Sequence, residues 1–248
     1  MNNNFVVKTV SISKKYDKND VLKKVSFSVS KGEIFVFLGP NGAGKTTTVK
    51  ILAGILKPDF GEVEILSQKM FPDNTEIKKF IGYLPDEPYV YNLLTGREFL
   101  SFISSIYKIK FDEQKFDYYL DKLDLKNVID QIISSYSKGM KQKLLLMSIF
   151  LRDPEIYILD EPLIGLDPQS ISYLKKYIIE KSSLGKTIIL ATHLLDLAES
   201  LATRLVIIYE GEIIISGTKK ELVQKLNLSE NASLEQIYLV ATKSEKSL

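Results

Sequence analysis

A glycine-rich segment beginning at Gly39 has the residue types and spacing of a loop that binds phosphate. Its sequence, GPNGAGKTT, fits G-x-x-x-x-G-K-[ST], with Gly39, Gly44, Lys45 and Thr46 at the four fixed positions. Glycines allow positive φ, so such a loop can turn its backbone N–H groups toward an anion at a helix start. We expect Lys45 to reach the β- and γ-phosphates of a nucleotide and Thr46 to hold Mg²⁺. The predicted nucleotide contacts are Gly39, Pro40, Asn41, Gly42, Ala43, Gly44, Lys45, Thr46 and Thr47.

The alternative is a chance glycine-rich turn. At an ordinary glycine frequency, the pattern would arise by accident in roughly one chain of this length in a hundred. The flanking sequence favours the functional interpretation, because IFVFL (34–38) has the pattern of a buried strand and TTTVKILAGIL has a helical period. A strand, this loop and a helix are the context that nucleotide binding requires.

Two further sets of polar residues follow apolar runs. Asp160 and Glu161 follow IYIL, and His193, the chain's one histidine, follows TIILAT. In an open parallel sheet, ligands bind at the carboxyl ends of the strands. Asp160 is therefore placed to hold Mg²⁺, and Glu161 to deprotonate an attacking water, a role typically worth about 10²–10⁴-fold in rate. The alternatives are a helix cap for the two acids and a structural role for His193; we favour catalysis and a γ-phosphate contact.

Strands and helices alternate along most of the chain, which places these residues in an α/β fold. Strands that are apolar throughout predict a mostly parallel sheet covered on both faces, the core of a phosphate-loop NTPase. The N-terminal part differs, since FVVKTVSIS (5–13) alternates and a second strand follows a turn at 14–20, which predicts an antiparallel β part. Residues from about 93 to 152 are predicted as nearly continuous helix, an inserted helical subdomain. Tyr16, at the tip of the turn, is by default an exposed aromatic.

Local capping signals mark the starts of three predicted helices. Thr95 and Glu98 have the spacing of a capping box. Ser137 precedes the helix KGMKQKLLLMSIFL and is placed to cap it. Asp167 is predicted to cap another helix, with Pro168 in the first turn.

Composition excludes several classes of function. The 248 residues are 45% hydrophobic and 26% charged, with a net charge of +2, so no global field would draw in nucleic acid. The chain has no cysteine, which excludes disulfides, iron–sulfur clusters and cysteine-ligated zinc. The N-terminus lacks the pattern of a secretion signal, and the apolar runs are too short to span a bilayer. Any membrane role is expected to go through a partner.

Five motifs occur together in the order found in one known family: GPNGAGKTT, YSKGMKQK, ILDEP, GLDP and a strand ending in ATH. On these motifs, the chain resembles the ATP-binding subunit of an ABC transporter over essentially its whole length. The resemblance implies ATP and Mg²⁺ as cofactors and a head-to-tail pair of subunits. In that pair, Ser137 and Gly139 would contact the γ-phosphate of the partner's ATP, and Asp167 would communicate across the interface. Tyr16 would stack on adenine, a contact worth about 1–3 kcal/mol.

The chain departs from the family pattern at two places. The family's signature is usually LSGGQ, whereas Lys138 and Met140 stand here at a glycine and at the glutamine. We call residues 136–143, YSKGMKQK, the signature segment. After FIGYLP, Asp86 stands where the family usually has a glutamine; a carboxylate can still bind Mg²⁺, so Asp86 is a predicted metal ligand. Both departures resemble bacterial ATPases that pair with export-type permeases.

The resemblance also predicts how the chain is organised and where it works. We expect a single ATPase domain over residues 1–248, with an ATP-binding core at about 1–88 and 153–225, a helical subdomain at about 89–152 and a helical tail at about 226–248. The expected partners are a membrane permease, which would dock near Tyr89 to Leu94, and a second ATP-binding subunit, identical or not. The expected location is the cytoplasmic face of the cell membrane, with no bound nucleic acid.

Two other functions compete with a transport motor. A non-transport ABC ATPase acting on ribosomes or nucleic acid usually has two ATPase cores or a coiled-coil insertion, and this chain shows neither. A regulator that hydrolyses ATP poorly is suggested by Asp86 and Lys138. It is opposed by the intact set of Lys45, Thr46, Asp160, Glu161 and His193. The sequence does not indicate the transported substrate.

Overall fold

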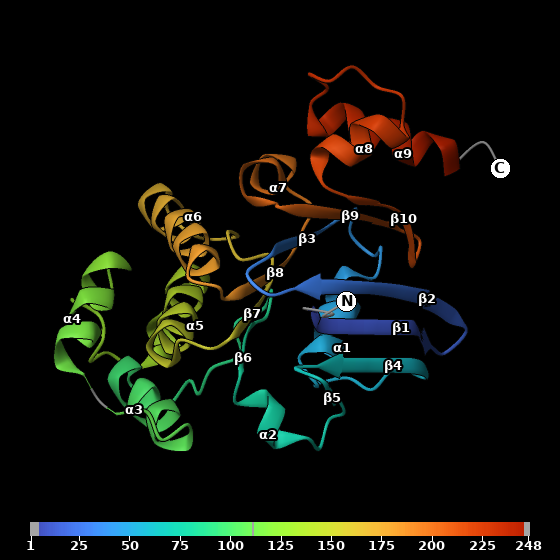
Figure 1. The fold of residues 1–248 in the computed structure, drawn as a ribbon. Helices are drawn as coiled ribbons and strands as arrows, with labels where there is room; N and C mark the ends of the chain where they lie inside the picture. Colours follow the sequence, from blue (N-terminus) through green and yellow to red (C-terminus); the bar gives the residue numbers. More distant parts are fainter. Residues whose placement is uncertain (1–4, 111, 246–248) are drawn as a thin grey trace.

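The computed structural model describes residues 5–110 and 112–245, whose strands form two sheets (Figure 1). The larger sheet has the strand order β10-β9-β3-β8-β7-β6, with parallel pairing throughout except at the β9–β10 hairpin on its edge. Its strands are β3 (Ile34–Leu38), β6 (Ile81–Leu84), β7 (Ile156–Asp160), β8 (Thr187–Thr192), β9 (Arg204–Tyr209) and β10 (Glu212–Gly217). The predicted α/β class with a mostly parallel sheet is confirmed.

The smaller sheet is antiparallel and comes mostly from the N-terminal part, as predicted. Its strand order is β2-β1-β4-β5. The strands are β1 (Phe5–Tyr16), β2 (Asn19–Ser30), β4 (Phe60–Ile65) and β5 (Gln68–Lys69). The predicted turn over 14–20 is wrong in length, because cross-strand pairing continues until Tyr16 faces Asn19. Asp17, with φ 52°, and Lys18 alone make the turn, so Tyr16 ends a strand.

Successive side chains of the central strand β3 point to opposite faces of the sheet, so they pack into two different apolar cores. Phe35 and Phe37 pack on the side of α1 (Lys45–Leu52), which contacts β7 and β8 of the large sheet and β2 of the small one. Val36 and its neighbours pack into the other core, beneath α6 (Pro168–Ser183) and α7 (Leu195–Leu201). Helices therefore cover both faces of the sheet, which explains why strands such as β3 are apolar throughout.

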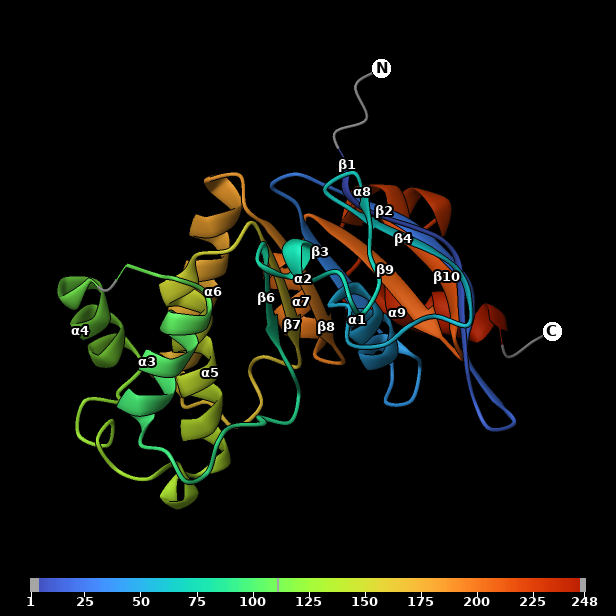
Figure 2. The ribbon, with the colours of Figure 1, turned by 90° about the horizontal axis from the view of Figure 1, so that it is seen from below.

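Three helices group at the side of the large sheet away from the antiparallel sheet (Figure 1 and Figure 2). These are α3 (Gly96–Ile106), α4 (Glu113–Lys122) and α5 (Lys138–Arg152). The prediction of nearly continuous helix is wrong between α4 and α5, where only the short 3₁₀ turn Ile133–Ser135 is helical. Backbone groups there pair with an earlier segment instead, as in the 2.8 Å bond from Ile133 N to Leu94 O.

The predicted helix caps are confirmed. The Thr95 hydroxyl accepts from the Glu98 backbone N–H while Glu98 reaches back to Thr95, completing a capping box. The Ser137 hydroxyl accepts from the backbone of the first turn of α5, and the Asp167 carboxylate does the same for α6, where Pro168 is the first helical residue. Local hydrogen bonding thus fixes where these helices begin.

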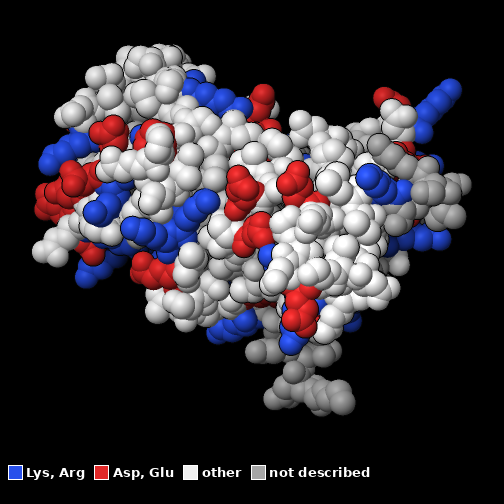
Figure 3. Space-filling view, turned by 90° about the horizontal axis from the view of Figure 1, so that it is seen from above, with Lys and Arg blue, Asp and Glu red and all other residues white. Residues whose placement is uncertain are grey.

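The remaining elements complete the outside of the molecule. They are α2 (Thr75–Lys78), α8 (Lys219–Lys225) and α9 (Leu234–Glu245), of which α8 and α9 lie against β10. Within residues 5–110 and 112–245, no helix is long and apolar enough to cross a bilayer. On the face drawn in Figure 3, basic and acidic side chains are interspersed, in keeping with a net charge of +2. One apolar core joins the large sheet to α3–α5, and the predicted boundaries between core, helical subdomain and tail stay predictions.

Candidate functional site

The strand order brings the predicted polar residues to one edge of the large sheet. β3, β8 and β7 are neighbours, although they are far apart along the chain. Leu38 pairs with Thr192, and Asp160 pairs with Ala191, so these three strands end at the same level. The glycine-rich loop, Glu161 and His193 come directly after these ends, where an open parallel sheet binds its ligands.

Lys45 lies folded back into its own loop. Its ammonium donates to Gly39 O at 2.8 Å and to Pro40 O at 3.0 Å, and the residue is only 5% exposed. Burial lowers the pKa of Lys45, and the negative charges of Glu161 and Asp160 oppose that shift. The loop therefore holds a buried cation where the predicted phosphates would lie.

Glycine at position 44 is required by the backbone of the loop. Gly44 has φ 102°, a conformation that residues with a side chain rarely adopt. A Cβ atom on it would also lie 2.8 Å from Val21 O. Because β2 approaches the loop this closely, only glycine fits at position 44.

Glu161 is held by three groups from the neighbouring strand end and the loop. Its Oε1 lies 2.8 Å from His193 Nδ1 and 3.9 Å from Lys45 Nζ. Its Oε2 accepts a 3.0 Å hydrogen bond from the Thr192 hydroxyl. The backbone of Glu161 has φ 46°, an uncommon conformation for a residue with a side chain, and such residues cluster at functional sites. The carboxylate is therefore fixed at the mouth of the loop.

Asp160 is a buried acid without a hydrogen-bond partner. The residue has no exposed surface, and neither carboxylate oxygen makes a hydrogen bond of ordinary geometry. Burial raises the pKa of Asp160 to about 6; the Thr46 hydroxyl nearby opposes the rise, and the charge of Asp86 adds to it. A buried carboxylate in this state favours a cation beside it.

These residues fit a Mg²⁺ ion that is shared with phosphate. Asp160 and the Thr46 hydroxyl offer the hard oxygen ligands that Mg²⁺ prefers, and Asp86 lines the same cavity. Among the described residues, no group of three or more His, Cys, Asp or Glu side chains could hold a metal ion on its own. The set therefore fits an ion that one or two carboxylates and a nucleotide hold together.

Eight of the predicted site residues line one cavity of 250 Å³. Its lining consists of Val21, Asn41, Gly42, Gly44, Lys45, Thr46, Thr47, Asp86 and Glu161. Asp160, the residue before Glu161, is fully buried. His193 contacts the carboxylate of Glu161, and the carbonyl oxygens of Gly39 and Pro40 accept hydrogen bonds from the Lys45 ammonium. Ala43 is buried within the loop.

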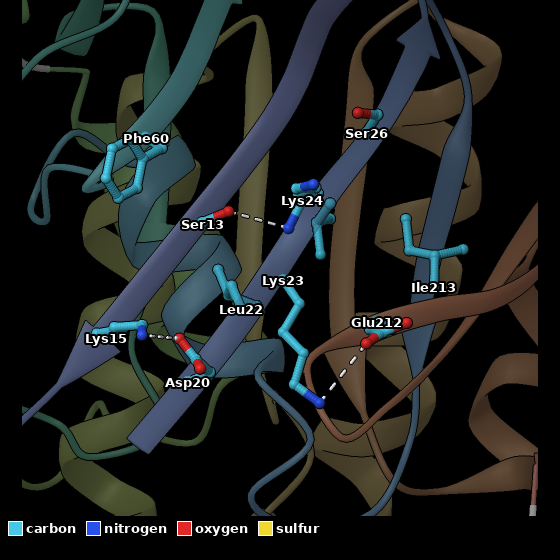
Figure 4. Close-up of a pocket in the computed structure, with 11 residues that line it drawn as sticks. Ser13, Lys15, Asp20, Leu22, Lys23, Lys24, Ser26, Phe60, Glu212 and Ile213 are labelled. Carbon is cyan, nitrogen blue, oxygen red and sulfur yellow. Dashed lines mark hydrogen bonds and ion pairs between the residues drawn. The ribbon is translucent and has the colours of Figure 1, made fainter. Parts of the chain in front are cut away.

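A larger cavity of 770 Å³ lies between β2 and β10 (Figure 4). Two lysines of its lining form ion pairs with acidic residues of the same lining, Lys15 with Asp20 at 3.1 Å and Lys23 with Glu212 at 3.6 Å. It contains none of the predicted site residues. The smaller cavity is the better candidate, because the buried Lys45, the glycine-rich loop and the carboxylate of Glu161 meet there, and burial shifts the pKa of Lys45.

Three further predicted contacts are neither in the lining of the phosphate cavity nor hydrogen-bonded to it. Ser137 and Gly139 lie at the start of α5, and Tyr16 lies at the end of β1, 46% exposed. The Lys14 ammonium lies 5.9 Å from the centre of the Tyr16 ring. The roles of Ser137, Gly139 and Tyr16 stay predictions, and for the first two the resemblance already placed the contact on a partner's ATP.

Sequence reasoning missed three residues beside the site. Val21 lines the cavity, Thr192 holds Glu161, and Lys143 in α5 pairs with Asp167 at 2.6 Å. Thr192 could have been predicted, because it is a polar residue at the end of the apolar strand TIILAT. Lys143 gave none, because its partner is 24 residues away along the chain.

Comparison with known proteins gives a consistent result. The profile of the family described as "ABC transporter" matches residues 22–164. The chain is 32% identical to the ABC-type transporter ATP-binding protein EcsA of Bacillus subtilis, over 93% of this chain and 94% of that protein. It is 35% identical to the SkfA peptide export ATP-binding protein SkfE of the same organism, over 82% of this chain and 85% of that protein. A solved structure described as the ATP-binding subunit of an ABC transporter superposes with a TM-score of 0.87 at 31% identity, covering 96% of this chain and 99% of the other.

Proposed function

The chain belongs to the ABC transporter family as an ATP-binding subunit, and we propose that it hydrolyses ATP to drive export through a separate membrane permease. Two such subunits close on ATP and open after hydrolysis, and the permease converts that motion into transport. Export is supported by the relative SkfE, whose name describes peptide export. This chain's cargo is set by the permease.

The observation that carries the proposal is the unpartnered buried Asp160 beside the cavity lined by Lys45 and Glu161. In the reaction, Lys45 leaves the carbonyls of its own loop and binds the phosphates. Glu161 takes a proton from water as the water oxygen bonds to the γ-phosphorus. The bond from that phosphorus to the β–γ bridging oxygen breaks, giving ADP and phosphate. Bound Mg²⁺ supplies positive charge to the phosphate oxygens, and Asp160 and Thr46 are the residues that hold it.

The proposed dimer explains the residues that lie away from the cavity. Ser137 and Gly139 begin α5, whose first N–H groups and positive end suit a phosphate. In a head-to-tail pair, these groups face the γ-phosphate bound to the other subunit. Tyr16, exposed at the end of β1, stacks on the adenine of its own subunit's ATP.

An exposed apolar surface is the proposed docking site for the permease. Tyr89, Tyr91 and Leu93 are 77%, 58% and 91% exposed. Tyr91 packs edge-on against Phe102 of α3, and Ile106, one turn further on, is exposed as well. Apolar side chains gathered in this way mark interaction surfaces. The segment also follows directly after Asp86, which connects the permease contact to the phosphate cavity.

Glu161→Gln tests the function. The variant is expected to bind ATP, hydrolyse it at least about 100-fold more slowly and accumulate as a dimer, because the base is lost while the phosphate site remains. Lys45→Ala is the companion variant, which is expected to lose nucleotide binding. Glu87→Gln, an exposed neighbour of Asp86, is the control that keeps the parent rate. Hydrolysis by Glu161→Gln at the parent rate would exclude Glu161 as the base.

Tagged Glu161→Gln protein, purified with ATP from gently solubilised native membranes, tests the transport role. Mass spectrometry is expected to find a polytopic membrane protein in stoichiometric amount. Double substitution of Tyr91 and Leu93 by Ser is expected to abolish that capture. A ribosomal companion, or an ATP-dependent dimer without a membrane protein, would instead favour the non-transport ABC ATPase.

A further inference from the structure

A short ion pair joins two segments that contribute to different ATP sites of the proposed dimer. Lys143 Nζ lies 2.6 Å from Asp167 Oδ2, and only 8% of the lysine side chain is exposed. Lys143 ends the signature segment in the second turn of α5, and Asp167 ends the loop that follows Glu161. The pair therefore connects the signature segment of a chain to the loop that carries its own base.

A close backbone contact connects the same two segments one helical turn earlier. A Cβ atom on Gly139 would lie 2.1 Å from the carbonyl oxygen of Gly165, so only glycine fits at this position. Gly165, in the middle of the loop, has φ 80°. Because Gly139 and Lys143 are four residues apart, they lie on the same face of α5. That face holds the loop both at its middle and at its end.

Asp167 is fixed on its other side as well. Its Oδ1 accepts from the Ser170 backbone N–H at 2.9 Å, and its Oδ2 accepts from the Ser170 hydroxyl at 2.8 Å. Burial acts to raise the pKa of Asp167, but the hydrogen bonds from Lys143 and Ser170 outweigh it and hold that pKa well below its ordinary value. The carboxylate thus joins the start of α6 to α5.

The loop from Glu161 to Asp167 is short and is closed by backbone hydrogen bonds. A backbone bond of 3.2 Å from Ile164 N to Glu161 O closes its first turn. Another of 3.2 Å, from Leu166 N to Leu163 O, closes its second. These two hydrogen-bonded turns link Asp167 to Glu161 within a loop of seven residues.

We propose that Lys143 is a positioning residue that ties the signature segment to the Glu161–Asp167 loop and so makes the two ATP sites of the dimer respond to each other. The inference rests on the proposed function, in which each chain supplies Glu161 to its own ATP and Ser137 to its partner's. When the signature segment closes on the partner's γ-phosphate, the tie carries that movement to Glu161 of the same chain. Occupancy of one site thereby orients the base in the other.

The test compares Lys143→Met with Lys143→Arg in the purified full-length chain. The Met variant keeps the apolar stem of the side chain and removes its charge, whereas Arg keeps the charge. ATP hydrolysis is measured against ATP concentration, and ATP binding is titrated with a fluorescent analogue. We expect parent and Lys143→Arg to give a Hill coefficient above 1, with an upper limit of about 2 for two sites. Lys143→Met is expected to fall to about 1 and to lose at least about fivefold in kcat, with unchanged binding of the analogue.

Lys181→Met is the matched control for a loss of stability alone. Lys181, in the last turn of α6, is similarly shielded at 12% side-chain exposure and lies 2.7 Å from Asp153, the residue at the far end of α5. Its substitution is expected to lower the thermal midpoint about as much as Lys143→Met while leaving the Hill coefficient unchanged. Asp167→Asn keeps a good helix cap and removes the charge. It is expected to reproduce the Lys143→Met result. The double variant, Lys143→Met with Asp167→Asn, is expected to lower kcat and the Hill coefficient no further than either single substitution does.

The outcomes separate this inference from the proposed function. If the parent hydrolyses ATP cooperatively and Lys143→Met keeps its kcat and Hill coefficient, the tie is refuted and the function stands. A hydrolysing parent with a Hill coefficient of 1 refutes the tie as well. If the parent neither hydrolyses ATP nor forms an ATP-dependent dimer as Glu161→Gln, the proposed function is refuted together with the tie.

Discussion

Replacement of Asp160 by asparagine in metal-free buffer is expected to stabilise the protein at neutral pH, although it removes a predicted metal ligand. The pKa of Asp160 is raised from 3.8 to about 6, mainly by burial. Because the folded protein holds this proton more tightly than the unfolded chain, stability from this group is greatest at low pH. It is lost as pH rises from about 4 through about 6.

The magnitude follows from the size of the shift. Two units correspond to about 3 kcal/mol of lost stability once Asp160 is ionised, and at about pH 4.5 the loss is still only about 1 kcal/mol. The asparagine side chain of the variant cannot ionise, so the gain in unfolding free energy relative to the parent should be about 2 kcal/mol larger at about pH 7.5 than at about pH 4.5. At neutral pH, the full gain of about 3 kcal/mol corresponds to a rise of about 6–12 °C in the thermal midpoint for a chain of this size.

Urea unfolding with EDTA at both pH values measures the difference directly. Asp59→Asn is the control with the opposite sign, since hydrogen bonds from the Lys14 ammonium and the Lys15 backbone lower the pKa of Asp59. That variant should lose stability at neutral pH. Adding MgATP should then stabilise the parent more than Asp160→Asn, because the ion offsets the buried charge. An Asp160→Asn variant whose stability relative to the parent does not change with pH would refute the account of Asp160 as an unpartnered buried charge.

Two further predictions concern the residues around the nucleotide. Thr192→Val should lower kcat about tenfold, because Glu161 loses the hydroxyl that holds its carboxylate in place. Thr192→Ser should restore the rate, and an unchanged kcat in Thr192→Val would count against this contact. Tyr16→Ala should weaken ATP binding about 5- to 150-fold and Tyr16→Phe should leave it unchanged, as measured by titration; equal affinities for all three proteins would remove Tyr16 from the adenine site.

Much of the fold and of the candidate site could be predicted from local sequence alone. The glycine spacing from Gly39 to Gly44 specifies a loop that only residues without a Cβ can form, and the buried strands are visible as uninterrupted apolar runs. Ser137 and Asp167 cap helices through hydrogen bonds made within three residues, so their roles needed no tertiary information. Strand ends are where an α/β sheet binds ligands, which is why Asp160, Glu161 and His193 could be proposed together.

The break between α4 and α5 could not be predicted in the same way. Residues 123–137 keep apolar side chains at helical spacing, yet the backbone N–H groups of Ile133 and Ser134 bond to the segment before α3. A bridge between Thr95 and Ile132 belongs to that pairing. Periodicity reports which side chains are buried, but it does not report which backbone partner competes for the N–H groups.

The amino-acid sequence by itself determined which residues are proposed to bind and react: the predicted phosphate loop, base and metal-holding acid are recognised by residue type and short spacing. Tertiary structure alone decided how those groups are held. The strand order β3-β8-β7 sets Thr192 against Glu161, and the packing of α5 on the following loop sets Lys143 against Asp167. Complete burial leaves Asp160 without a partner. These properties depend on distances between segments far apart in the chain, which spacing along the sequence does not encode.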